Sequence, residues 1–198
     1  MFWLLAGPVA AQDVVGTSIV TGKRVELLSD HTWRFTEARK LPATCIPVNA
    51  RIAFCGSPLE WWPSSTSGTD FLRVFRHDDR TYAGMIYEGI GEDDGLMAEV
   101  YRELIIRRTA DVAGVGANEI PVLSSTATEV EGIAGETLVY GARLAGIAMV
   151  FMNTVIVQAS YSAQFVTWSL GKEQTAEHVA LHAAFLDAID MTGPEESR

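Results

Sequence analysis

The stretch IAMVFMNTVIVQASYSA, residues 147–163, decides the fold class of this chain. Its second part alternates between two faces: Val155, Val157, Ala159 and Tyr161 on one, and Ile156, Gln158, Ser160 and Ser162 on the other. This period of two is typical of a strand with one buried and one mostly polar face. Asn153 and Thr154 break the apolar run, so we expect a hairpin of two strands, IAMVFM and TVIVQASYSA, and not a membrane helix.

Further strand-like segments lie before this stretch and are separated by short turns. FLRVFRH and RTYAGMIYEGI form one such pair within residues 71–90. PVLSSTATEVEGI and GETLVYGARLA form another, joined between Gly132 and Gly135. Strands connected by short turns pair antiparallel, so the sequence predicts a largely antiparallel sheet.

Two segments have the apolar spacing of amphipathic helices. In the first, the expected buried residues are Leu96, Met97, Val100, Tyr101, Leu104 and Ile105. In the second, residues 172–190, they are Val179, Ala183, Leu186 and Ile189. The order of strands, a helix, more strands and a final helix predicts an α+β fold, in which an antiparallel sheet carries both helices on one face.

The chain is expected to contain one main domain behind a small N-terminal unit. The expected segments are a signal-peptide remnant over 1–11, a β-meander over 12–37, a linker over 38–50, the α+β domain over 51–191 and a polar tail over 192–198. In the meander, turns are expected at Thr21-Gly22 and at Ser29-Asp30-His31, because these residue types favour turns.

The opening MFWLLAGPVAAQD carries the signal for export. It is uncharged as far as Ala11 and has small residues before Gln12, which is the pattern of a signal-peptide cleavage site. No basic residue precedes Lys23, so a structured N-terminus is the alternative. Export predicts a periplasmic or secreted location.

Cys45 and Cys55 are close together and are the two cysteines of the chain. In an oxidising compartment two nearby cysteines most often pair, so we expect a structural disulfide, with free thiols as the alternative. The spacing is not C-x-x-C and no histidine lies between them, so neither redox nor metal chemistry is expected here.

Composition limits the classes of partner and of chemistry. The net charge of −10 argues against nucleic acid and against anionic membrane surfaces. Hydrophobic residues make up 48% of the chain, which is enough for a sizeable core. The patterns GxGxxG and GxSxG are absent, so we expect no cofactor and assign no catalytic residue.

His178 and His182, in EHVALH, have the i,i+4 spacing of zinc ligands on a helix. The glutamate precedes the first histidine, so the HExxH motif is not matched. His182 also falls near the expected apolar stripe of its helix. We therefore expect a partly buried structural histidine and no metal site.

Trp61-Trp62-Pro63 is the candidate partner-binding site, within a loop that continues as SSTSG. Adjacent aromatics in a loop can form a recognition surface, because rigid rings bury area at low entropic cost. The alternative is that one tryptophan fills the core while the other lies on the surface.

These residues carry a resemblance to a known family. CGSP at 55–58, the two tryptophans after it, FLRVFRHDDRTYAGMIYEGI with the helix that follows, GIAGE at 132–136 and VIVQASYSA occur in the order seen in the PsbP-like fold. The chain resembles this family over about residues 45–191. The resemblance implies an extrinsic or periplasmic accessory protein without a shared catalytic set. The N-terminal meander lies outside it and resembles a D-G-T-W element in which His31 replaces the glycine.

Three functions follow as hypotheses. The first is an exported, non-catalytic accessory or binding module that contacts a protein partner, without nucleic acid and without a membrane span. The second is a periplasmic hydrolase with an unfamiliar site, which a His, Asp and Ser cluster in a deep pocket would favour. The third is a carrier of a small apolar ligand, which a large dry cavity would favour.

Overall fold

The computed structural model describes residues 14–20, 23–35, 45–66 and 70–191. The chain divides into two compact units, residues 1–40 and 41–198. The expected signal-peptide remnant with its cleavage site before Gln12, the expected turn at Thr21-Gly22 and the polar tail lie outside the described residues. Each unit is described by itself.

The N-terminal unit contains a three-stranded antiparallel meander. Its strands, in the order in which they pair, are β1 (Val14–Val20), β2 (Lys23–Leu28) and β3 (Trp33–Phe35). The turn expected at Ser29-Asp30-His31 is present, and the Asp30 carboxylate accepts a hydrogen bond from the Thr32 amide at 3.0 Å. His31 has a φ of 65°, in the left-handed region that favours glycine and in which histidine is also enriched.

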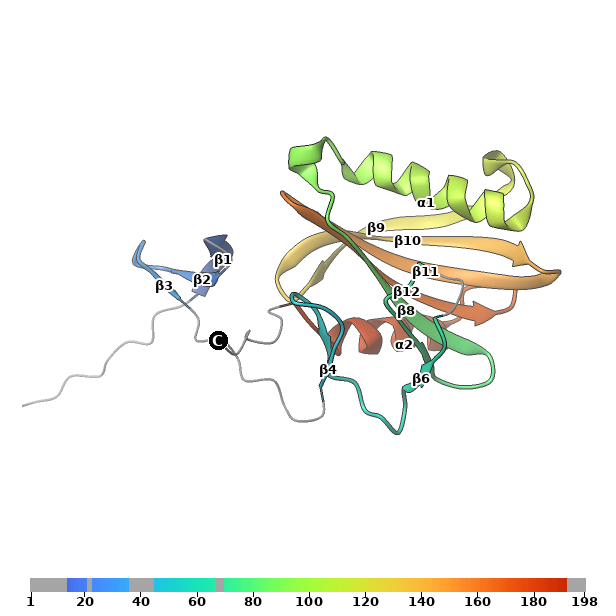
Figure 1. Ribbon diagram of the computed structural model, residues 1–198, viewed down its shortest axis with the longest axis horizontal. Coiled ribbons are helices and arrows are strands. Elements are labelled where there is room, and N and C mark those ends of the chain that lie inside the picture. Colours follow the sequence, from blue (N-terminus) through green and yellow to red (C-terminus); the bar gives the residue numbers. More distant parts are fainter. Residues whose placement is uncertain (1–13, 21–22, 36–44, 67–69, 192–198) are drawn as a thin grey trace, which may run out of the picture. The chain divides into compact units, whose positions relative to one another are not determined.

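The main unit is built on a seven-stranded antiparallel sheet, ordered β6-β7-β8-β12-β11-β10-β9 (Figure 1). Its strands are β6 (Trp62–Ser64), β7 (Arg73–Arg76), β8 (Thr81–Glu88), β9 (Val122–Val130), β10 (Ile133–Leu144), β11 (Ile147–Gln158) and β12 (Tyr161–Leu170). Side chains in the turns stabilise the hairpins. Between β7 and β8, the Asp78 carboxylate accepts hydrogen bonds from the amides of Arg80 and Thr81, both at 2.7 Å. The predicted α+β class and antiparallel sheet are confirmed.

The hairpin expected at Asn153-Thr154 is wrong. β11 runs unbroken through both residues, and the chain turns after Gln158 instead. Asn153 and Thr154 are buried in mid-strand, where Gln164 and Thr137 supply hydrogen-bond partners. A buried polar pair with partners is compatible with a continuous strand, although in the sequence it looks like an interruption.

The two helices cover opposite faces of the sheet, so their expected placement on one face is wrong (Figure 1). Helix α1 (Ala98–Ala113) packs with Leu138 and Phe151, whereas α2 (Ala176–Asp187) packs through Phe185 with Ile156. Neighbouring residues of one strand point to opposite faces, so both faces of β11 and β12 are buried. Short 3-10 turns, η1 (Glu92–Asp94) and η2 (Ala117–Glu119), flank α1.

The faces expected for the two helices are only partly correct. Of the residues expected to be buried in the first helix, Leu96, Tyr101 and Ile105 are buried, whereas Met97, Val100 and Leu104 are exposed. On α2 the buried side chains are His178, His182 and Phe185. Val179 and Ala183 are exposed, and Ile189 belongs to a strand. Apolar spacing found both helices, but it misplaced the buried face of α2, because His178 and His182 occupy part of that face.

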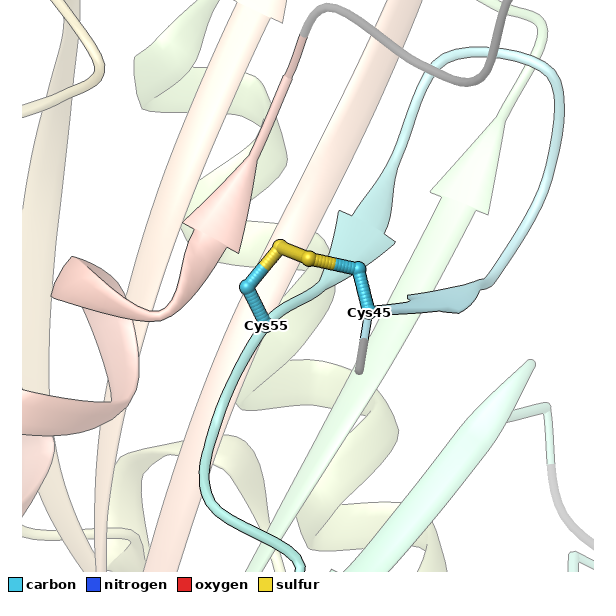
Figure 2. Close-up of a disulfide and its surroundings, with 2 residues drawn as sticks. All are labelled: Cys45 and Cys55. Carbon is cyan, nitrogen blue, oxygen red and sulfur yellow. A yellow bond between two sulfur atoms is a disulfide. The ribbon is translucent and has the colours of Figure 1, made fainter. Parts of the chain in front are cut away.

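A small three-stranded sheet closes the α2 side of the unit. It consists of β4 (Ile46–Pro47), β5 (Ala53–Phe54) and β13 (Ile189–Asp190), ordered β13-β5-β4. Residues 46 and 47, within the expected linker, thus pair with β5. The expected disulfide is present: Cys45 and Cys55 flank β4 and β5, with 4.1 Å between their Cα atoms (Figure 2).

Candidate functional site

Trp61 fills the core and Trp62 lies on the surface, which is the alternative given above for this pair of tryptophans. Only 4% of Trp61 is exposed, and its ring lies 5.2 Å from that of Phe185 and 6.1 Å from that of Phe54. Trp62, the first residue of β6, is 43% exposed. Trp61 is therefore part of the core, and the surface available to a partner at this place comes from Trp62 and Pro63.

A tight turn positions Trp61. The Ser57 carbonyl accepts hydrogen bonds from the amides of Glu60 and Trp61, at 3.0 and 2.9 Å. Gly56 makes room for the packing, because a Cβ there would lie 2.3 Å from the Phe54 ring and 2.9 Å from Trp61. The turn formed by CGSP at 55–58 therefore places Trp61 in the core.

Trp62 lies at an outer edge of the large sheet. Its strand, β6, pairs with β7 and places Trp62 opposite Arg76. The Arg76 guanidinium lies 5.5 Å from the centre of the Trp62 ring, within range of a cation–π interaction. Arg76 also reaches the Asp79 carboxylate at 3.5 Å. We call Trp62, Pro63 and Arg76 the Trp62 surface.

The two histidines of α2 belong to a buried hydrogen-bonded chain. His182 contacts the Thr154 hydroxyl through Nε2 at 2.8 Å and the Thr167 hydroxyl through Nδ1 at 2.9 Å. His178 Nε2 contacts Thr167 at 2.9 Å, and Thr137 contacts Thr154 at 2.7 Å. Burial lowers the pKa of both histidines, that of His182 to about 3, and the neighbouring His178 contributes to the latter shift. The structural role expected for His182 agrees with these contacts.

One buried atom without a partner determines which group donates in each hydrogen bond of this histidine–threonine network. His178 Nδ1 is buried without a hydrogen-bond partner. An unpaired acceptor costs less than an unpaired buried N–H, so we place the His178 proton on Nε2. His178 then donates to Thr167, Thr167 donates to His182, and the His182 Nε2–H donates to Thr154. Both imidazoles are neutral in this arrangement.

A second buried network faces α1, and sequence reasoning missed it. The Asn153 amide donates to Gln164 at 2.8 Å, and Gln164 donates to the Tyr101 hydroxyl at 3.0 Å. Tyr101 donates to Glu88, and its burial, together with that hydrogen bond, raises its pKa to about 12. The signal available in the sequence was Gln164, which stands between Ala163 and Phe165 in the middle of a strand.

A shallow recess of about 430 Å³ lies beside the N-terminal end of α1. Its lining combines small and apolar residues with polar ones: Ala98, Ala127, Ala134, Gly135, Val155 and Val157, with Glu92, Glu136 and Gln158. Glu136 is already paired with Arg102 at 2.8 Å. This recess is open to solvent and carries carboxylates, so it differs from the dry cavity that a carrier of an apolar ligand requires.

Within residues 14–20, 23–35, 45–66 and 70–191, no three His, Cys, Asp or Glu side chains gather in a way that could hold a metal ion. In the same part of the chain, no helix is long and apolar enough to cross a membrane.

Comparison with known proteins identifies the fold. No family model and no curated protein matches the sequence. The solution structure of cyanobacterial PsbP (CyanoP) from Synechocystis sp. PCC 6803 matches with a TM-score of 0.54 and 14% identity, over 72% of this chain and 87% of that chain. The fold is PsbP-like, which confirms the resemblance seen in the sequence.

Two further solved structures are similar at lower scores. One, from Bacteroides thetaiotaomicron, has a TM-score of 0.46 and 11% identity, over 77% of this chain and 48% of that chain. A protein of unknown function from Pseudomonas aeruginosa has a TM-score of 0.36 and 9% identity, over 85% of this chain and 89% of that chain.

Proposed function

We propose that this chain is an exported, non-catalytic accessory module that binds a protein partner through the Trp62 surface. The observation that carries the proposal is the exposure of Trp62 at a sheet edge beside Arg76, directly after a tryptophan that is buried. The PsbP-like fold supports an accessory role, because the resemblance implies extrinsic accessory proteins. The disulfide fits an oxidising compartment.

Rigidity makes Trp62 suitable as a binding anchor. Its backbone is paired with β7, and its neighbour Trp61 is locked in the core between Phe54 and Phe185. The backbone of Trp62 is therefore ordered before binding, and little conformational entropy remains to be lost. Tryptophan and arginine are the side chains most enriched among residues that dominate binding energies.

The partner is expected to contact side chains and not to extend the sheet at this edge. β6 contains three residues, all exposed, and Pro63 has no amide hydrogen to offer. Short edge strands that contain proline are poor templates for strand addition. A partner with an apolar pocket for the indole and a carboxylate near Arg76 matches the chemistry of this surface.

The binding test compares the native protein with Trp62→Ala. Each protein is immobilised and used to capture partners from a periplasmic extract of the source organism, and the affinity for the captured partner is then measured by calorimetry. Removal of a central tryptophan anchor costs about 2 kcal/mol or more, so we expect affinity to fall at least about thirtyfold. Equal affinity for the same partner would refute the role of the Trp62 surface.

Matched variants separate binding from folding. Trp33→Ala removes another exposed tryptophan, in the N-terminal unit, and should leave the affinity unchanged. Trp61→Ala opens the core and should lower the unfolding temperature, whereas Trp62→Ala should not. If Trp62→Ala unfolds the protein, Trp62 has a packing role and the proposed surface is wrong.

Export is tested on the same preparation. N-terminal sequencing of protein from the periplasm or the medium should read QDVVG, as cleavage before Gln12 requires. Recovery of the chain with Met1 intact from that fraction would contradict cleavage at this site. Recovery only from the cytoplasm would contradict export itself.

A further inference from the structure

The two edges of the large sheet differ in how well they are protected. One edge is β6, with three residues and Pro63. The other is β9, with nine residues, which pairs with β10 and has no second neighbour among the described strands (Figure 1). In an edge strand, alternate residues direct their N–H and C=O groups away from the sheet. β9 therefore presents a row of backbone donors and acceptors on its outer side.

The usual protections of an edge strand are largely missing from β9. Its sequence, VLSSTATEV, contains no proline, lysine or arginine, and its one charge is Glu129. The register with β10 shifts between Val139 and Tyr140, which leaves Leu123 as a bulge at the start of the strand. From Ser124 to Val130 the pairing is regular, and most of these side chains are exposed. A long edge with regular pairing, no proline and a single charge is a template for another strand.

The same seven residues are complementary to a second copy of themselves. An antiparallel pairing with a two-fold axis at Ala127 places Thr126 opposite Thr128 of the second copy and Ser125 opposite Glu129. Threonine pairs are favourable across strands, and no like charges face each other in this register. The Ser125 hydroxyl keeps its own partner, because it donates to Glu136 on β10. We propose that β9 is a self-association edge, through which two copies of this chain pair β9 with β9 about Ala127.

The surroundings of β9 are compatible with such a pairing. Helix α1 packs mainly on β10 and β11, so β9 lies beyond the helix at the rim of the sheet. The pairing would join two sheets into one continuous sheet, which is the isologous arrangement of a two-fold dimer. It leaves the Trp62 surface free, because β6 is the opposite edge of the same sheet. The proposal is therefore independent of the proposed function.

The dimer is expected to be weak and to depend on salt. Seven paired residues span about 24 Å of strand, which is less contact than a stable interface usually has. Each copy also carries a net charge of −10, and repulsion between two such molecules is screened by ions. We expect a concentration-dependent monomer–dimer equilibrium that shifts toward dimer as the salt concentration rises.

The first test introduces repulsion at the edge. The double variant Thr126→Lys/Thr128→Lys sets lysine opposite lysine twice in the proposed register, which should weaken the dimer about tenfold or more. The control, Leu59→Lys/Ile90→Lys, adds the same charge at two exposed residues outside β9. Sedimentation equilibrium of the full chain is measured for native protein and both variants. A native protein that stays monomeric at all concentrations, or an edge variant that dimerises like the control, would overturn the proposal.

The second test fixes the register. A cysteine at Ala127 faces its own counterpart across the two-fold axis, at a Cα separation of about 4.5–5.5 Å, which a disulfide can bridge. A cysteine at Ser124 would lie about 20 Å from its counterpart. Under mild oxidation we expect Ala127→Cys to form a covalent dimer much faster than Ser124→Cys. Equal rates for the two variants would show that β9 is not paired about Ala127.

Discussion

The two faces of the large sheet differ in how completely their aromatic side chains are buried. The α2 face holds a dense aromatic cluster, in which the Phe54 ring lies 4.3 Å from that of Phe75 and 5.5 Å from that of Phe185. The α1 face also packs aromatic rings, such as those of Tyr140 and Phe151 at 5.1 Å, but these side chains are not completely buried. The fully buried phenylalanines, Phe54, Phe75, Phe165 and Phe185, all belong to the α2 face. Most of the stability should come from the α2 face.

Buried polar residues follow the same division. Towards α2, neutral histidines and threonines form a chain of hydroxyl and imidazole contacts. Towards α1, Asn153 and Gln164 lead to Tyr101 and on to the carboxylate of Glu88. The first network contains no carboxylate, whereas the second ends in one. Between about pH 5.5 and 7, where histidines and not carboxyl groups ordinarily titrate, acid should therefore act mainly through the buried histidines of the α2 face.

The largest effect is expected from Phe185→Ala. Phe185 is completely buried and touches the rings of both Phe54 and Trp61, so its truncation opens a cavity at the centre of the α2 face. We expect a loss of about 3–5 kcal/mol in the free energy of unfolding, measured by urea denaturation. The matched change Leu104→Ala on α1 should cost at most about 0.5 kcal/mol. Similar losses for the two variants would remove the proposed difference between the faces.

Removal of the disulfide should have the next largest effect. Cys45→Ala/Cys55→Ala releases a short loop that ties β4 to β5 on the α2 side. On the chain-entropy model the loss is about 2–3 kcal/mol. The measurement is urea denaturation of the double variant beside native protein with and without reductant. If reduction leaves the native protein as stable as before, the crosslink adds nothing to this face.

The α1 network should contribute less than either. In Gln164→Leu, the buried Asn153 amide loses its acceptor and Tyr101 loses a donor. An unsatisfied buried polar group costs about 1–3 kcal/mol, so we expect a loss in that range. Asn153→Leu/Gln164→Leu removes both partners and should recover part of the loss. A double variant that is worse than the sum of the single ones would contradict this account of the network.

The outcome of sequence reasoning depended on whether a residue's partner is local. Turn residues such as Asp78 and Asp30 act within their own hairpins, so the antiparallel strands could be predicted. The placement of the helices could not, because it depends on contacts between distant residues. Asn153 was wrongly predicted to end a strand, because its hydrogen-bond partner Gln164 lies on the next strand and is not apparent from the local sequence.

The candidate site shows the same limit. Trp61 and Trp62 are adjacent and chemically identical, so the sequence cannot say which one is buried. Trp61 is the buried one because Phe185, more than a hundred residues away in the sequence, packs on it. The structural role of His182 was predictable from its position in a helix. Its threonine partners lie on β11 and β12 and could not be foreseen.

The smallest effect, and the most specific to the α2 face, is a dependence of stability on pH. His182 stays neutral in the folded protein until about pH 3, because burial lowers its pKa, whereas in the unfolded chain it takes up a proton below about pH 6.5. The unfolded state therefore binds more protons in this window, and stability must fall as the pH falls. From pH 6.5 to 5.5, His182 should contribute a loss of about 1 kcal/mol.

His182→Gln isolates this contribution, since glutamine does not titrate and can still hydrogen-bond to Thr154 or Thr167. Urea denaturation at pH 7.5, 6.5 and 5.5 should show a flatter dependence for His182→Gln than for the native protein. His31→Gln, at an exposed position in the N-terminal unit, is the matched control variant. His178 is buried on the same face with a lowered pKa, so part of the slope should persist in His182→Gln. A slope unchanged by His182→Gln would mean that the pH dependence does not arise from this histidine.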